Sequence, residues 1–227
     1  MPSAHDALHL ALKSCGLIAI LRGVTTLEVA AIGQTLYATG FRIIEVPLNS
    51  PDPLASVQVL RQTLPDDCVV GAGTVIAPSD CALIAAAGGQ VAVMPHSDPL
   101  VIRAAKEAGL ACIAGVATPT EAFAALAAGA TMLKMFPSVA LGPVALKAWR
   151  DVIPSSVAIL PVGGLQPENL GAYMAAGASG FGLGSALYRP NDHLERIRQM
   201  ARLFMQAWRG PYPSAGTAVA DPPPSRL

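Results

Sequence analysis

The chain has 227 residues, a formal net charge of zero and 52% hydrophobic residues, and only 13% of its residues are charged. The balanced charge argues against nucleic acid as the main partner, because binding to a phosphate backbone needs an excess of Lys and Arg. The apolar runs fall short of the roughly 20 residues that a membrane-spanning helix needs. The N-terminus lacks the basic start and apolar core of a secretory signal. Scattered cysteines without a CxxC pair fit a reducing compartment, so we expect a cytoplasmic protein.

Short apolar runs alternate along the chain with Ala-rich segments of helical period. The high apolarity and low charge indicate a parallel sheet that is buried on both faces. A short helix is predicted at 4–15, before the first strand. The predicted strands are 17–23, 42–49, 68–75, 91–96, 111–116, 132–137, 158–164 and 180–188. The helices that follow them are predicted at 25–40, 51–64, 77–89, 97–109, 118–130, 142–154, 166–178 and 191–208.

Eight successive strand–helix units predict an α/β fold that closes into a TIM (β/α)8 barrel with a short N-terminal helix. An open doubly wound sheet is the alternative, but the glycine-rich turns at 71–76 and 182–187 both lack the third glycine of a dinucleotide-binding turn. We expect residues 1–209 to form a single barrel domain. Residues 210–227 are rich in Pro, Ala and Gly without an apolar period, and we expect them to form a disordered tail.

Two charged residues interrupt apolar strands, at the strand ends where barrel active sites lie. Lys134 is the one lysine within a predicted strand, and Glu45 is the one acidic residue that interrupts an apolar strand. Desolvation lowers the pKa of a lysine and leaves a neutral amine that can form a Schiff base with a carbonyl. A nearby carboxylate can then carry protons to and from the covalent intermediate. These properties predict Lys134 and Glu45 as catalytic residues. A structural ion pair, or a lysine that snorkels to the rim, is the alternative.

Glycine-rich turns follow the seventh and eighth strands. In barrels, the backbone N–H groups of these two loops often bind phosphate. Glycine also lets an anion approach the backbone closely. We therefore predict a phosphate site at Gly163, Gly184 and Ser185, the alternative being glycines that only permit tight turns.

Other strand ends offer further polar groups. Arg22 has the geometry to clamp a carboxylate or phosphate, although an ion pair with Glu45 is an equal alternative. Thr74 is predicted to donate its hydroxyl to a substrate carboxylate, or else is simply a β-branched strand residue. No His, Cys, Asp or Glu residues stand at metal spacing, so neither a metal nor a cofactor is expected.

The ordered set of motifs resembles the Schiff-base aldolases that split 2-keto-3-deoxy-6-phospho-sugar acids. The matching segments are LRG at 21–23, EVPLNSP at 45–51, GAGTV at 71–75, ATPTEA at 117–122, LKMFPS at 133–138, VGG at 162–164, and GLGS at 182–185 with LYR at 187–189. Together they cover essentially the whole of the expected barrel. Single motifs of this kind occur elsewhere, but the ordered set is specific.

The resemblance implies a class I aldolase, a carbon–carbon lyase that forms a homotrimer and works on a phosphorylated sugar acid and pyruvate. It places the Schiff-base lysine at Lys134 and the proton-transferring carboxylate at Glu45. The substrate contacts that it implies are Arg22, Thr74, Gly163, Gly184 and Ser185.

Within this family the chain resembles the type that cleaves 2-dehydro-3-deoxy-6-phospho-D-galactonate to pyruvate and D-glyceraldehyde 3-phosphate. Gluconate-type relatives usually have Thr and Arg where this chain has Val162 and Asn49. A threonine hydroxyl can hydrogen-bond the C4 hydroxyl in one configuration, whereas valine offers only shape. Val162 is therefore predicted to bind substrate and to set the choice of epimer, and packing of the barrel interior is the alternative.

Three other functions stay open. The first is the sister aldolase for the gluconate epimer. The second is a phosphate-binding barrel isomerase or epimerase, in which Glu45 is the base and Lys134 polarises a carbonyl without a covalent bond. The third is a sensor of phosphorylated metabolites without catalytic activity.

Overall fold

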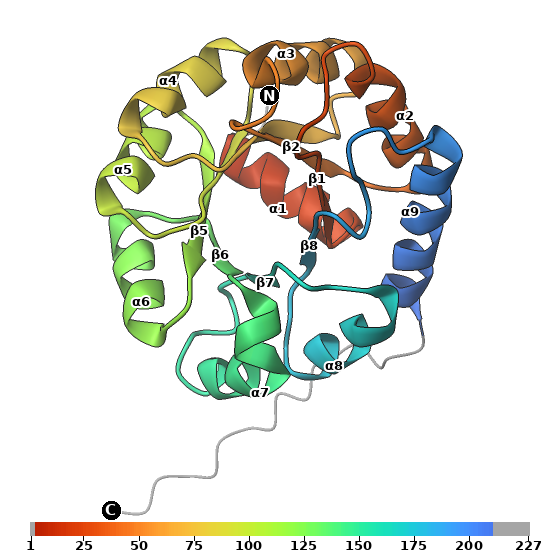
Figure 1. Cartoon of the computed structure of the whole chain (residues 1–227). Helices are drawn as coiled ribbons and strands as arrows, with labels where there is room; N and C mark the ends of the chain where they lie inside the picture. Colours follow the sequence, from red (N-terminus) through yellow and green to blue (C-terminus); the bar gives the residue numbers. More distant parts are fainter. Residues whose placement is uncertain (1–2, 211–227) are drawn as a thin grey trace, which may run out of the picture.

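The structure is a computed structural model that describes residues 3–210. Within these residues, eight parallel strands alternate with helices, and the helices form a ring around the strands (Figure 1). The TIM barrel with a short N-terminal helix that the sequence predicts is confirmed. The expected tail, apart from Gly210, lies outside the described residues.

The strands are β1 Leu17–Ile20, β2 Ile43–Pro47, β3 Val69–Gly73, β4 Val91–Val93, β5 Ala111–Val116, β6 Met132–Met135, β7 Ile159–Pro161 and β8 Phe181–Leu183. The helices are α1 Ala4–Ser14, α2 Val29–Thr39, α3 Pro53–Thr63, α4 Pro78–Ala86, α5 Pro99–Glu107, α6 Pro119–Ala128, α7 Ser138–Arg150, α8 Leu170–Ala175 and α9 Leu194–Arg209, with a 3-10 helix η1 at Pro167–Asn169. None of the helices in the described part of the chain has the length and apolar character that a membrane span requires.

Neighbouring strands in the barrel are also neighbours in the chain. The hydrogen-bonded order is β7-β6-β5-β4-β3-β2-β1-β8. The ring closes between its two ends through one bridge, which joins Val162 to Gly182. β2 and β6 therefore lie on opposite sides of the barrel.

Local sequence signals explain where several helices begin and end. Thr118 accepts a hydrogen bond from the backbone N–H of Glu121, whose side chain accepts in return from the backbone of Thr118, so α6 starts with a capping box. Asp98 caps α5 through the N–H of Leu100. α6 ends on Gly129 with a φ of 106°, a left-handed conformation that glycine adopts without a steric penalty.

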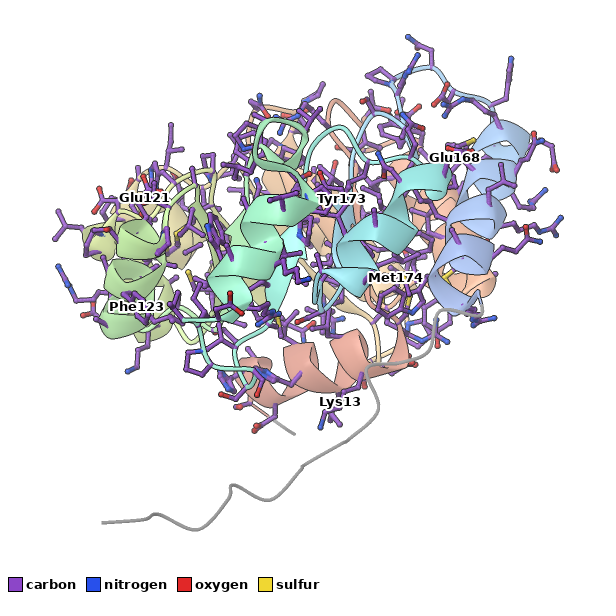
Figure 2. The ribbon with its side chains drawn as sticks, turned by 90° about the horizontal axis from the view of Figure 1, so that it is seen from below. Lys13, Glu121, Phe123, Glu168, Tyr173 and Met174 are labelled. Carbon is purple, nitrogen blue, oxygen red and sulfur yellow. The ribbon has the colours of Figure 1, made fainter. Side chains whose placement is uncertain are left out.

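Helix α1 closes one end of the barrel. Its Leu8 and Ala11 pack against interior side chains near the start of the strands, such as Ile18, Ile43 and Met132. Figure 1 shows α1 lying across the middle of the ring, and Figure 2 shows it beneath the barrel, with Lys13 at that end and Glu168 toward the other. An apolar plug therefore fills the N-terminal end of the barrel and leaves room for a cavity at the C-terminal end.

Several element boundaries differ from the predicted ones. The predicted strands run past the observed ends, for example to 188 where β8 ends at Leu183, because the apolar pattern continues into residues that leave the sheet to line the cavity. α7 begins at Ser138, before the predicted start at 142, and a kink at Gly142, with a φ of 74°, divides it. The helix predicted at 166–178 is instead η1 followed by the short α8.

Candidate active site

A cavity of about 250 Å³ lies at the C-terminal ends of the strands. All the site residues predicted from the sequence line it: Arg22, Glu45, Thr74, Lys134, Val162, Gly163, Gly184 and Ser185. Further lining residues that the sequence reasoning did not select are Ile20, Leu165, Gln166 and Ala186. These residues come from strands all around the barrel, so no short sequence window could reveal the whole set.

Lys134 and Glu45 are buried on opposite strands, with 7% and 2% of their surfaces exposed. Lys134 lies in β6, and its Nζ is 4.5 Å from the centre of the Phe136 ring. Glu45 lies in β2, and its Oε2 is buried without a hydrogen-bond partner. Within residues 3–210, neither side chain takes part in a salt bridge. The alternative of a direct structural ion pair therefore has no support in this geometry.

Burial changes the pKa values of both groups. Loss of solvent raises the pKa of Glu45 to about 7, although the nearby charges of Lys134 and Arg22 oppose the rise. Burial also lowers the pKa of Lys134; the charge of Glu45 opposes this shift, and that of Arg22 adds to it. The site thus shifts Lys134 toward the neutral amine that nucleophilic attack requires, and it brings the titration of Glu45 near neutral pH, where a carboxyl group can both give and take a proton.

Gly73, at the end of β3, makes room for the Glu45 carboxylate. A Cβ at this position would overlap both carboxylate oxygens of Glu45. Sequence reasoning gave Gly73 no role, because within the GAGTV segment only Thr74 offered a polar side chain. The signal available in the sequence was the position of Gly73. It lies near the end of a predicted strand, and the preceding strand carries the buried Glu45.

Arg22 is held by neutral partners. Its Nη1 donates to Oδ1 of Asn49 at 2.5 Å, and its Nη2 donates to Oγ1 of Thr74 at 3.2 Å. The predicted alternative, an ion pair with Glu45, is absent from the described residues. Thr74 has a φ of 55°, a left-handed conformation that is strained for a β-branched residue and is often found at functional sites. Since Thr74 Oγ1 accepts from Arg22, its own hydroxyl proton is free to donate elsewhere.

The glycines of the two glycine-rich turns differ in backbone conformation and in the space around them. Gly163 and Gly164 have φ values of 99° and 77°, so their backbone conformation favours glycine. A Cβ on Gly184, in contrast, would meet nothing within 4 Å. Neither Gly184 nor Ser185 donates its backbone N–H to an acceptor in the described part of the chain. Such N–H groups at the edge of a cavity suit an anion.

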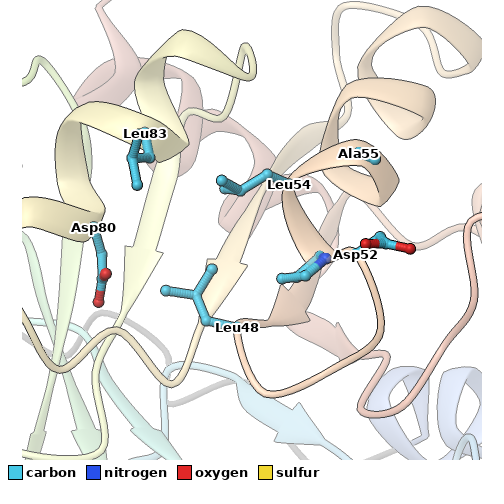
Figure 3. Close-up of a pocket in the computed structure, with 7 residues that line it drawn as sticks. Leu48, Asp52, Leu54, Ala55, Asp80 and Leu83 are labelled. Atoms are coloured by element: carbon cyan, nitrogen blue, oxygen red, sulfur yellow. The ribbon is translucent and has the colours of Figure 1, made fainter.

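Two further observations concern metal ions and a second hollow in the molecule. Residues 3–210 contain no group of His, Cys, Asp and Glu side chains that could hold a metal ion. A second hollow, of about 360 Å³, lies between α3 and α4 (Figure 3). Its lining includes the carboxylates of Asp52 and Asp80 and no basic residue, so it is poorly suited to an anionic substrate.

Known proteins with similar sequences are aldolases. The family model "KDPG and KHG aldolase" matches residues 8–200. The chain is 43% identical over 196 residues to a probable 2-dehydro-3-deoxy-6-phosphogalactonate aldolase of Rhizobium meliloti (strain 1021), covering 86% of this chain and 92% of that protein. It is 45% identical to the 2-dehydro-3-deoxy-6-phosphogalactonate aldolase of Escherichia coli (strain K12), covering 85% and 94%.

Solved structures agree with these relatives. A structure described as native KDPGal superposes with a TM-score of 0.83 at 44% identity, covering 85% of this chain and 94% of that one. A KDPG aldolase from Legionella pneumophila, with pyruvate captured as a covalent carbinolamine intermediate, superposes with a TM-score of 0.76 at 26% identity, covering 88% and 97%. The chain therefore belongs to the KDPG and KHG aldolase family of lyases.

Proposed function

We propose that this enzyme cleaves 2-dehydro-3-deoxy-6-phospho-D-galactonate to pyruvate and D-glyceraldehyde 3-phosphate through a Schiff base on Lys134. The observation that carries the proposal is the pair of buried groups in one cavity, a lysine with a lowered pKa and a carboxyl whose pKa is raised to about 7. The names of the two relatives at 43% and 45% identity support this substrate.

In the proposed mechanism, neutral Lys134 attacks the C2 ketone and forms a carbinolamine. Glu45 donates a proton to the departing hydroxyl, which leaves as water and gives the protonated imine. This imine withdraws electrons, so that when the Glu45 carboxylate takes up the C4 hydroxyl proton, the C3–C4 bond breaks and the aldehyde is released. A proton from Glu45 then converts the enamine at C3 into the imine of pyruvate, and hydrolysis returns free Lys134.

The remaining lining residues bind the two ends of the substrate. Arg22 carries a positive charge next to the Thr74 hydroxyl, and together they bind the substrate carboxylate. The backbone around Gly163, Gly184 and Ser185 binds the distal phosphate. Binding both ends fixes the carbon chain over Lys134 and thereby contributes orientation to the reaction. No metal or cofactor takes part in any of these steps.

We also propose a homotrimer, which the family resemblance implies. The scattered cysteines support a cytoplasmic location, and the repeated strand–helix units support a single domain at residues 1–209. The oligomeric state is measured by sedimentation equilibrium on the full chain. A mass corresponding to one or two copies would contradict the trimer and leave the proposed reaction untouched.

The test of the proposed function is trapping with pyruvate and borohydride, followed by peptide mass analysis and a cleavage assay. We expect one stable three-carbon addition at Lys134, and loss of both labelling and cleavage in Lys134→Ala. Lys147→Ala, at an exposed position on α7, is the control and keeps both. Cleavage without a label would indicate a non-covalent barrel enzyme, and phosphate binding without cleavage would indicate a sensor.

A further inference from the structure

We propose that Ser138 and Asn169 are positioning residues that aim the backbone N–H groups of the glycine loop, residues 163–165, at the substrate phosphate. The inference rests on the proposed function, because it concerns how the phosphorylated end is held. It assigns a role to two side chains that lie outside the lining of the cavity.

Ser138 is the side chain that holds the first carbonyl of the glycine loop, beside a 3.1 Å hydrogen bond from the backbone N–H of Val139. It is fully buried at the start of α7, and its Oγ donates to the carbonyl oxygen of Gly163 at 2.6 Å. Its own carbonyl accepts a hydrogen bond from the hydroxyl of Tyr173 at 2.8 Å. Tyr173 is itself 5% exposed, so α8 holds the serine from behind. The serine is therefore constrained on both sides, which makes it a firm anchor.

Asn169 fixes the second carbonyl. Its Nδ2 donates to the carbonyl oxygen of Gly164 at 3.1 Å, and its Oδ1 accepts from the backbone N–H of Gln166 at 3.0 Å. The two bonds use opposite ends of one amide group. Together they fix which way the side chain faces.

Because these two carbonyl groups are fixed, the geometry of the peptide also fixes the direction of the N–H group that follows each of them. In a trans peptide, the C=O and the following N–H point in opposite directions. The bond from Ser138 to the Gly163 carbonyl thus directs the N–H of Gly164 away from the serine. The bond from Asn169 to the Gly164 carbonyl directs the N–H of Leu165 away from the asparagine. Within residues 3–210 neither of these N–H groups has an acceptor, and both residues line the cavity.

The anchors matter because the loop consists largely of glycine. Two consecutive glycines have many accessible backbone conformations, and the positive φ values at Gly163 and Gly164 are only one of them. If each incoming phosphate had to order the loop, the entropy lost on ordering would weaken phosphate binding. Hydrogen bonds from other elements select the binding conformation in advance.

The test compares Ser138→Ala and Asn169→Ala on two substrates, the phosphorylated keto acid and the same acid without its phosphate. Each variant loses one neutral hydrogen bond that holds a donor in place. We therefore expect the ratio of kcat/KM values, phosphorylated over unphosphorylated, to fall roughly threefold to tenfold. The rate of pyruvate trapping at Lys134 should stay the same, because pyruvate carries no phosphate.

Ser56→Ala is the matched control, since Ser56 is also fully buried but lies on α3, outside the cavity lining. It should leave the substrate ratio unchanged. A loss of equal size on both substrates, or an unchanged ratio in folded Ser138→Ala and Asn169→Ala, overturns the inference. Absence of cleavage by the unmodified enzyme would instead overturn the proposed function, so the two failures are distinguishable.

Discussion

The guanidinium of Arg22 donates a 2.5 Å hydrogen bond to the amide oxygen of Asn49, and its positive charge has no carboxylate partner among residues 3–210. A neutral acceptor fixes the position of the group and does not cancel its charge. That charge favours the ionised form of Glu45 and the neutral form of Lys134. It also remains available to an anionic substrate, which an ion pair with Glu45 would prevent.

We expect Asn49→Asp to weaken substrate binding. The new carboxylate keeps the acceptor but pairs with Arg22, so the KM for the phosphorylated keto acid should rise by about tenfold. Steady-state kinetics at low ionic strength measure the change. Gln34→Glu, which adds the same charge at an exposed position on α2, is the control. An unchanged KM in Asn49→Asp would show that Arg22 does not meet the substrate.

Glu45→Gln should stabilise the fold at neutral and alkaline pH. The pKa of Glu45 is raised from 4.5 to about 7 in the folded chain, so folding favours its protonated form. The stability that this form contributes is fully present below pH 4.5 and is lost as the pH rises through about 7. Glutamine does not ionise, so its advantage over Glu45 should grow between pH 5 and pH 8, by up to about 3 kcal/mol.

Urea unfolding at the two pH values measures this difference. Glu107→Gln, at an exposed position on α5, is the control. Its free energy of unfolding should differ from that of the unmodified chain by the same amount at both pH values. A gain from Glu45→Gln that did not depend on pH would contradict the assignment of the titration to Glu45.

Val162→Thr should shift the choice of epimer toward the gluconate form. Val162 is 8% exposed and lines the cavity, and threonine has nearly the same volume. One new hydrogen bond to the C4 hydroxyl should change the ratio of kcat/KM for the two epimers roughly threefold to tenfold. Competition assays with both substrates report the ratio. Val101→Thr, buried on α5, should leave it as it was, and no change in Val162→Thr would mean that this side chain only packs the barrel.

Gly184→Val should raise the KM for the phosphorylated substrate about tenfold or more and leave pyruvate trapping nearly intact. A Cβ at this position meets no protein atom within 4 Å, so the valine side chain enters space that the phosphate would use. A substitution at Gly184 is therefore expected to change substrate binding without changing the fold. Equal damage to trapping and to KM would show that the turn is needed for the fold alone.

The sequence was sufficient for the barrel and for the two buried charged residues that line its cavity. Eight repeated units determine the architecture, and a charge inside an apolar strand marks Glu45 and Lys134 without any knowledge of contacts. The partners of these groups could not be found in this way. Asn49 follows β2 by two residues but binds Arg22, which follows β1 by two residues, and Asn169 binds Gly164 across a turn of the backbone. Such hydrogen bonds depend on three-dimensional placement and leave no periodic signal.

The strand boundaries could not be predicted for a related reason. A residue such as Leu187 is as apolar and as buried as the strand before it, so the apolar pattern continues after the strand β8 has ended. In a barrel, burial extends past the ends of the strands because the loops fold over the same core. Apolar composition therefore marks the core and does not mark the end of a strand.

Helix α1, beneath the barrel, limits the route by which substrate and products reach and leave the cavity. Leu8 and Ala11 close the N-terminal end of the barrel, and the cavity lies at the C-terminal ends of the strands, so we expect substrate and both products to pass through that end. In the proposed reaction, pyruvate remains tethered to Lys134 after the bond breaks. The aldehyde must therefore leave first and clear the passage before water releases pyruvate, so in the direction of synthesis pyruvate has to enter before the aldehyde.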